Sequence, residues 1–300
     1  MIDKTRLGIP LFDDRYGGIY RRRSALCIGR QGSGKTIAAI HFLMQSIKEG
    51  ERGLLLSAWR AHDLAIIAQQ MGFPLSEAVD KGQVALLEYA NIMPTPEFEK
   101  NLTLPPGSFM EFQDIVESNS FHRVAIDTVL PWVAIPQKDK LAKHIFSFIQ
   151  AIERMGVTTL LTMPKPVSPL AFTLKNRLEE QVPIVFTLEV DDQERHTMFV
   201  NKYLGENTLP PPVPFVITPG AGIIRAPKSV APAPAAPAAP WPKQTAPSHE
   251  PAPDRLRPAP QPAAPISFQV PQPASPPAPK PAPKPAPQKG PIKFSSAFNE

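Results

Sequence analysis

A glycine-rich turn between an apolar strand and an amphipathic helix constrains this chain more than any other feature of its sequence. Residues 25–28 form a short apolar run that predicts a buried strand, and the turn occupies residues 29–34. Apolar side chains then recur at helical spacing until Gly50 ends the pattern: Ile37, Ile40, Met44 and Ile47. A strand, a tight turn and a helix in this order predict the beginning of an α/β domain.

The rest of the first 225 residues continues the alternation of strands and helices. Further strands are predicted at residues 53–57, 84–87, 123–127 and 157–162, and further helices at residues 63–71, 109–117 and 141–155. Strands that alternate with helices form a parallel sheet covered by helices. Residues 184–190 and 196–202 flank a polar turn and predict an antiparallel hairpin, and a last short strand is expected at residues 215–218.

The chain changes character at residue 226. More than half of its 40 prolines lie beyond that point, in Pro-Ala repeats that bury too little apolar surface to fold and favour extended polyproline II. We therefore predict one domain over residues 1–225 and a disordered tail over residues 226–300. Two apolar islands, at 265–270 and 291–298, repeat a PI-x-F element and are candidate docking motifs for a protein partner.

Charge follows the same division. The tail holds eight Lys or Arg against three Asp or Glu, which accounts for the formal net charge of +5 and leaves 24 basic and 24 acidic residues before it. A balanced domain surface does not favour nucleic-acid binding.

Cysteine use and hydropathy indicate the compartment. Cys27 is the single cysteine, so no internal disulfide can form, and we expect it to be a small buried strand residue. The sequence lacks a signal-peptide core and an apolar run long enough to cross a membrane. These features predict a cytoplasmic protein without membrane insertion.

The turn itself matches G-x-x-x-x-G-K-[ST], the P-loop pattern. Its residues, all predicted to hold the nucleotide, are Gly29, Arg30, Gln31, Gly32, Ser33, Gly34, Lys35 and Thr36. Backbone amides of such a loop, together with the positive end of the following helix, bind phosphate groups. Lys35 is expected to reach the β and γ phosphates, and the Thr36 hydroxyl to bind Mg²⁺. We therefore predict ATP and Mg²⁺ as cofactors, although no residue identifies the base as adenine rather than guanine.

A second nucleotide-site residue is predicted at the end of strand 123–127. There an apolar run ends in Asp127, as a Walker B strand does. Its carboxylate would hold Mg²⁺ opposite Thr36.

These motifs, with several others, resemble the KaiC-like branch of the RecA superfamily of ATPases. The resemblance covers residues 7 to about 224 and includes Gly8-Ile9-Pro10, Asp13 or Asp14, Gly17-Gly18, Glu49-Gly50-Glu51 and the segments 154–162 and 199–205. It implies a RecA-like three-layer fold with a terminal antiparallel hairpin. It also implies a homo-oligomer, either a dimer or a hexameric ring.

The sequence departs from this family where hydrolysis is catalysed. The resemblance places paired glutamates where this chain has Trp59 and Arg60, and neither side chain can accept a proton from water. Glu88 is the reserve candidate for the base, followed by Glu51. In the family's Lys-x-Arg pair, which reaches the neighbouring subunit's nucleotide, Lys202 matches the lysine but Leu204 replaces the arginine. The catalytic residues therefore remain unknown, and an arginine finger alone is worth about 10³ to 10⁵ in rate.

Three functions compete on these observations. The preferred hypothesis is an ATP-binding regulatory or assembly factor with weak or absent hydrolysis, whose Pro-rich tail recruits a partner. The first alternative is an active ATPase motor or switch whose base or arginine finger comes from a partner. The second is a RecA-like DNA-binding or repair ATPase, which is not favoured because the tail's lysines are sparse and its few aromatic residues do not form a stacking platform.

Overall fold

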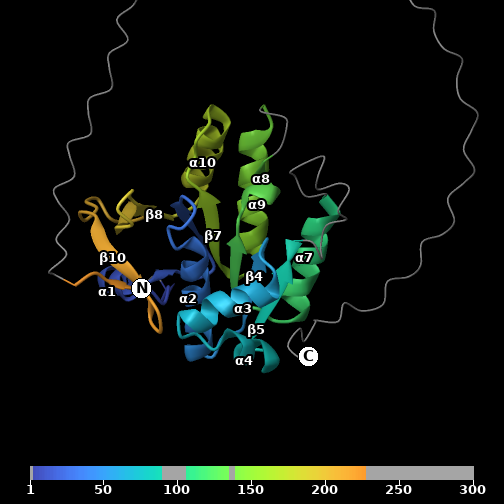
Figure 1. Cartoon of the computed structure of the whole chain (residues 1–300). Coiled ribbons are helices and arrows are strands. Elements are labelled where there is room, and N and C mark those ends of the chain that lie inside the picture. The colour runs from blue at the N-terminus through green and yellow to red at the C-terminus, as the bar shows by residue number, and fades with distance from the viewer. Residues whose placement is uncertain (1–2, 90–105, 135–138, 228–300) are drawn as a thin grey trace, which may run out of the picture. The chain divides into compact units, whose positions relative to one another are not determined.

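One nine-stranded sheet organises the computed structural model of the chain, in the order β11-β10-β9-β8-β3-β7-β6-β4-β5 (Figure 1). The structure describes residues 3–89, 106–134 and 139–227. Its parallel strands are β3 (Ser24–Gly29), β4 (Gly53–Ser57), β5 (Val84–Glu88), β6 (Arg123–Asp127), β7 (Thr158–Pro164) and β8 (Ile184–Val190). Strands β9 (His196–Tyr203), β10 (Val213–Thr218) and β11 (Gly222–Arg225) continue it antiparallel, while β1 (Lys4–Thr5) pairs separately with β2 (Ile19–Tyr20).

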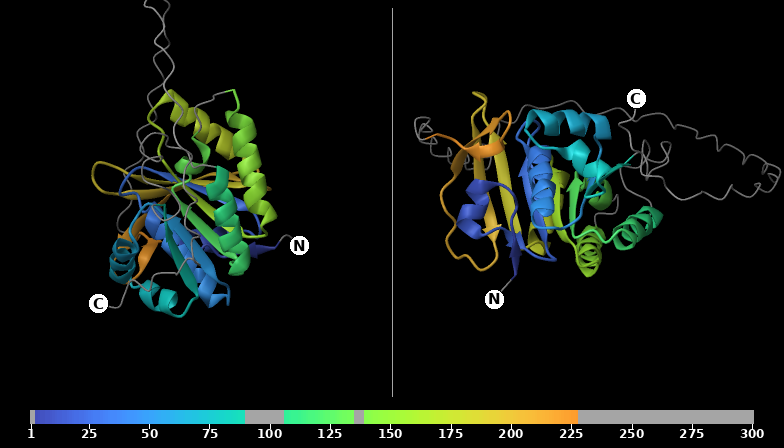
Figure 2. Two further views of the ribbon diagram at one scale, coloured as in Figure 1. Left: turned by 90° about the vertical axis from the view of Figure 1, so that its right-hand side faces the viewer. Right: turned by 90° about the horizontal axis from the view of Figure 1, so that it is seen from below.

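Helices cover both faces of the sheet, which gives the expected three layers (Figure 2). One layer contains α1 (Pro10–Tyr16), α2 (Lys35–Lys48), α3 (Ala61–Gln70) and α4 (Leu75–Asp80). The other contains α7 (Pro106–Ser118), α8 (Leu130–Val133), α9 (Leu141–Arg154) and α10 (Pro169–Gln181). The predicted fold class, a mainly parallel sheet flanked by helices with a late antiparallel hairpin, is confirmed.

The central strand β3 is mostly apolar because both of its faces are buried. In β3, Cys27 lies in the core under α2, as predicted for a buried cysteine, whereas Leu26 and Ile28 lie in the opposite core. Alternation of side chains along a strand produces this division, and strands covered on both faces therefore read as continuous apolar runs.

Some elements were not predicted from the sequence, and α10 shows why. The Ser168 hydroxyl accepts a hydrogen bond from the Ala171 amide at 3.2 Å, and Pro169 opens the helix, so its start is well marked. Its buried residues, however, are only Leu174 and Leu178, which is too few to give a clear helical period. The strand β11 was also missed, because the turn at Pro219-Gly220 was taken as the end of the last strand.

No helix among the described residues is both long and apolar enough to span a bilayer. The predicted tail lies outside the described residues from 228 onward, so its disorder and its two apolar islands stay predictions.

A buried histidine joins α2 to both ends of the domain. The His41 Nδ1 atom lies 2.8 Å from the Gly8 carbonyl oxygen, and Nε2 accepts a hydrogen bond from the Ile223 amide at 2.8 Å. Both contacts require a neutral ring that carries its proton on Nδ1. Desolvation by burial lowers the pKa of His41 to about 4.

We expect this histidine to destabilise the domain in mild acid. The unfolded ring takes up a proton below about pH 6.5 while the folded ring stays neutral to about pH 4, which costs about 3 kcal/mol across that window. Burial raises the pKa of Asp13 to about 6, which gives an opposite slope in the wild type and the variant alike. Urea unfolding at several pH values should therefore show the His41 slope as the difference between the wild type and His41→Asn. The exposed His62 is the control, because His62→Asn should keep the slope. An unchanged slope in His41→Asn would contradict the assignment.

Candidate nucleotide site

The glycine-rich turn lies where β3 passes into α2, as the sequence predicts. Gly29 ends β3, and a Cβ atom there would clash with the Leu188 carbonyl oxygen and the Ser33 side chain. Gly34 precedes α2 at φ 97°, a backbone conformation that favours glycine. Lys35 and Thr36 are therefore the first residues of α2, with their amides at the positive end of the helix dipole.

The structure brings Thr36 and Asp127 into direct contact although 91 positions separate them. The Thr36 hydroxyl donates to Asp127 Oδ2 at 2.8 Å, and the Asp127 carboxyl group is nearly buried at the end of β6. A hydroxyl and a carboxylate are hard oxygen ligands of the kind that Mg²⁺ takes together with retained waters and phosphate oxygens. The donor set thus fits the predicted ion.

We call the Thr36–Asp127 contact the Thr36–Asp127 corner. Thr162 is also part of it and was missed by the sequence analysis. Its hydroxyl, on the adjacent strand β7, donates to Asp127 Oδ1 at 2.5 Å. The two threonines together fix both oxygens of the carboxylate. The strand also contains Thr158 and Thr159, so nothing in the sequence singled out Thr162.

The cations of the turn have different surroundings. The Lys35 ammonium donates to the Arg30 carbonyl oxygen at 2.8 Å, and desolvation by burial lowers its pKa. The Arg30 guanidinium contacts the Val190 carbonyl oxygen and lies 3.5 Å from Asp192, so it points to the β8–β9 hairpin. Of these two cations, only the Lys35 side chain bonds to the backbone of the turn itself.

The remaining residues of the turn have fewer contacts. Gln31 and Gly32 are exposed, whereas Ser33 is fully buried and its hydroxyl has no hydrogen-bond partner among the described residues.

The segment that leaves β4 lies beside Asp127 and carries no carboxylate. Ser57 is the register partner of Asp127, and the Ala58 amide donates to the Asp127 carbonyl oxygen at 3.3 Å. Trp59 and Arg60 then follow, both exposed. That this segment lacks the general base stays a prediction from the sequence, and the register places the segment directly next to β6.

Glu88, the reserve candidate for the base, ends β5. It therefore lies at the carboxyl ends of the parallel strands, as Asp127 does, but on the outermost strand. Its Oε1 accepts a hydrogen bond from the Ala61 amide at 2.8 Å and so caps α3. Four strand spacings separate β5 from β3, or about 19 Å. Two strand spacings separate Glu88 from Asp127 on β6, and its role as a base stays a prediction.

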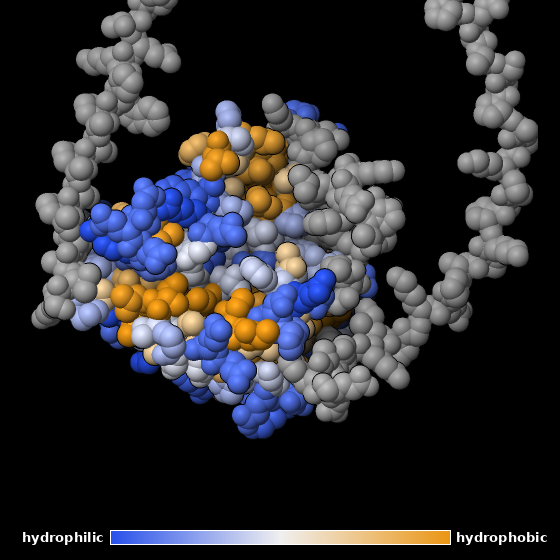
Figure 3. Space-filling view, in the orientation of Figure 1, coloured by the Kyte–Doolittle hydropathy of each residue, from blue (hydrophilic) through white to orange (hydrophobic). Residues whose placement is uncertain are grey.

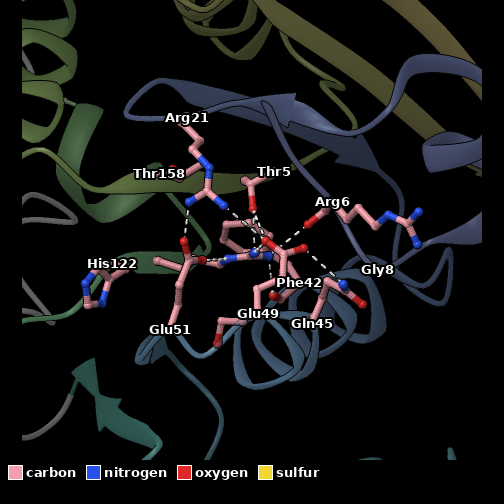
Figure 4. Close-up of polar contacts among 12 residues, drawn as sticks. Thr5, Arg6, Gly8, Arg21, Phe42, Gln45, Glu49, Glu51, His122 and Thr158 are labelled. Carbon is pink, nitrogen blue, oxygen red and sulfur yellow. Dashed lines mark hydrogen bonds and ion pairs between the residues drawn. The ribbon is translucent and has the colours of Figure 1, made fainter. Parts of the chain in front are cut away.

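Glu51 lies at the amino ends of the parallel strands, just before β4 begins, and its carboxylate faces Arg21 (Figure 4). Its carboxylate pairs with Arg21 and with Arg123, whose Nε donates to Glu51 Oε2 at 2.6 Å. Desolvation opposes ionisation of Glu51, but hydrogen bonds from the two arginines outweigh it and lower its pKa. It is placed to hold the fold together rather than to activate water at the turn of its own chain.

Lys202 and Leu204 lie at the end of β9. The Lys202 ammonium donates to the Glu179 carbonyl oxygen at 2.6 Å within the same chain, and the Leu204 side chain is exposed. A contact of Lys202 with a neighbouring subunit therefore stays a prediction, and it would require this hydrogen bond to be exchanged.

Comparison with known proteins agrees with this architecture. A family model described as "ATPase: KaiC" matches residues 5–229. The circadian clock oscillator protein KaiC of Synechococcus elongatus is 26% identical over 231 residues, which cover 72% of this chain and 43% of the relative. That of Parathermosynechococcus lividus is 27% identical over 229 residues, with 72% and 41% covered. The chain thus spans less than half the length of these curated relatives.

A solved structure shares the fold. The crystal structure of a KaiC-like protein from Pyrococcus horikoshii OT3 superimposes with a TM-score of 0.60 at 22% identity, covering 76% of this chain and all of the other. At this identity the likeness concerns the fold alone. The family model, in contrast, spans the whole described domain, and the chain belongs to the KaiC family of ATPases.

Proposed function

We propose that this chain binds ATP with Mg²⁺ through residues 29–36 and Asp127, and acts as a nucleotide-dependent regulatory or assembly factor. In this proposal hydrolysis is weak or absent, and residues 226–300 recruit a protein partner. The observation that carries it is the contrast between the Thr36–Asp127 corner and the exit of β4. The first has the groups that hold a metal and phosphates, whereas the second has no proton acceptor for the attacking water.

The surface of the domain supports self-association or partner binding. Figure 3 shows a hydrophobic area over the end of the molecule at which α10 lies. The exposed apolar residues here are Val167, just before α10, and Leu170 and Phe172 in its first turn. Clustered apolar residues on a surface commonly mark protein interaction sites. This supports an oligomer, a dimer or a ring of about six as implied by the resemblance, in which ATP stabilises the interface between subunits.

We expect purified protein to bind ATP and to leave it intact over hours. A lost base and a lost arginine finger should hold turnover far below the rate of about 1 per second that is ordinary for enzymes. The measurement is release of labelled phosphate from Mg·ATP, together with identification of the nucleotide that remains bound.

The result that contradicts weak hydrolysis is turnover at about 1 per second or faster that Lys35→Ala abolishes. In that case the active ATPase is the better description. Turnover that appears only after a partner protein is added would favour the alternative in which the partner supplies the missing groups.

A further inference from the structure

The exit of β4 is held rigidly at the edge of the nucleotide site. Besides the bond from the Ala58 amide to the Asp127 carbonyl oxygen, the Trp59 amide donates to Ser57 Oγ at 3.1 Å. The Ala61 amide is fixed by Glu88. The backbone on both sides of Arg60 is therefore anchored next to Asp127, so this arginine starts from a defined position.

The Thr36–Asp127 pair, which would hold Mg²⁺, lies on the side of the turn that faces β4. Strand β7 lies between β3 and β6, yet the hydrogen bond between Thr36 and Asp127 joins the first turn of α2 directly to the end of β6. Strand β4 is the next strand beyond β6, about 4.8 Å further on. A triphosphate whose Mg²⁺ lies at this corner would thus end one strand away from the segment that carries Arg60.

Arg60 is an unpaired cation in that place. Its side chain is exposed, and its guanidinium forms no hydrogen bond or ion pair with any residue that the structure describes, while its carbonyl oxygen accepts a hydrogen bond from the Leu64 amide at 3.1 Å. Arg30, by comparison, is bound to the β8–β9 hairpin. A guanidinium binds phosphate oxygens through paired hydrogen bonds, and it cannot accept a proton from water.

We propose that Arg60 contacts the terminal phosphate of ATP bound to the same chain, and that this contact makes the site prefer ATP to ADP. The proposal rests on the nucleotide site proposed above. It gives a role to Arg60, which stands where the family resemblance places a glutamate. The chain would use this position to recognise the triphosphate instead of cleaving it. ADP lacks the phosphate that Arg60 reaches, so the preference follows from one charge-assisted contact.

Calorimetric titration with Mg·ATP and Mg·ADP tests the proposal. Arg60→Gln should weaken ATP binding by about 10-fold or more, because hydrogen bonds to charged groups are of that strength, and should change ADP binding by less than about 2-fold. Arg60→Lys keeps the charge without the paired geometry and should lie between. The matched control is Arg154, which is exposed at the end of α9, near the amino ends of the parallel strands. Arg154→Gln should bind both nucleotides as the wild type does.

Two results would overturn the assignment. Equal weakening of ATP and ADP in Arg60→Gln would mean that Arg60 does not distinguish the terminal phosphate, and unchanged affinities would mean that it does not touch the nucleotide. In both cases the wild type still binds ATP, so the nucleotide site itself survives. A wild-type protein that binds neither nucleotide would overturn that site and this inference together.

Discussion

Replacing Lys35 by alanine should weaken binding of Mg·ATP by roughly 30-fold to 4,000-fold, which corresponds to about 2 to 5 kcal/mol for losing one partner of a buried charge pair. The ammonium is partly buried and donates to the Arg30 carbonyl oxygen at 2.8 Å. A phosphate group should replace that carbonyl as its partner. Calorimetry with Mg·ATP measures the loss directly.

Lys48 provides the control for this experiment. It belongs to the same helix but is exposed at its opposite end, where the helix dipole favours cations rather than phosphate. Lys48→Ala should therefore leave the affinity for ATP within about 2-fold of the wild type, because it lies far from the head of the helix. If Lys35→Ala binds ATP as well as Lys48→Ala does, the turn does not hold the phosphates and the proposed function fails.

The parts of the site that could be predicted from the sequence are those fixed by local pattern. The turn at residues 29–36 is continuous, so its position between β3 and α2 follows from the neighbouring residues alone. Asp127 was predicted because the strand after Arg123 is an apolar run that ends in a carboxylate, and the carboxyl ends of parallel strands meet at one end of the sheet. The contact between Thr36 and Asp127 is consistent with that expectation.

The parts that could not be predicted depend on which strands become neighbours. A carboxylate such as Glu88 ends a strand just as Asp127 does, and only the strand order shows that it lies at the outer strand and caps α3. Thr162 contacts Asp127 because β7 lies next to β6, although 35 positions separate the two residues. The attachment of Arg30 to the β8–β9 hairpin is a contact of the same kind. Sequence spacing contains no information on these distances.

Strand β6 has a polar cluster at each of its two ends. Asp127 ends it at the predicted nucleotide site, and Arg123 begins it and pairs with Glu49 and Glu51, which are labelled in Figure 4. Arg123 is fully buried, and its guanidinium donates to the Arg6 carbonyl oxygen at 2.8 Å and to the carboxylates of Glu49 and Glu51. The resemblance had marked Glu49-Gly50-Glu51 only as a family feature. The contacts give both glutamates a structural role.

Removing this buried guanidinium should cost about 3 to 5 kcal/mol of the free energy of unfolding, the usual loss when one partner of a buried ion pair is deleted. The variant Arg123→Met keeps most of the side-chain volume, so the loss would come from Glu49, Glu51 and the Arg6 carbonyl rather than from a cavity. Urea unfolding at neutral pH measures it. Arg177→Met removes an exposed ion pair with Glu180 instead, and its cost should stay below about 1 kcal/mol.

The effect of Arg123→Met should also depend on pH in a defined direction. Desolvation opposes ionisation of Glu49 and Glu51, but hydrogen bonds and the nearby arginine charges outweigh it and lower the pKa of each. Groups with a lowered folded pKa stabilise the protein above their unfolded pKa of about 4.3, and that contribution is lost as the pH falls further. The difference between wild type and Arg123→Met should therefore shrink below about pH 4. A difference of under 1 kcal/mol at neutral pH, or one that grows in acid, would show that the network does not stabilise the start of β6 through its charges.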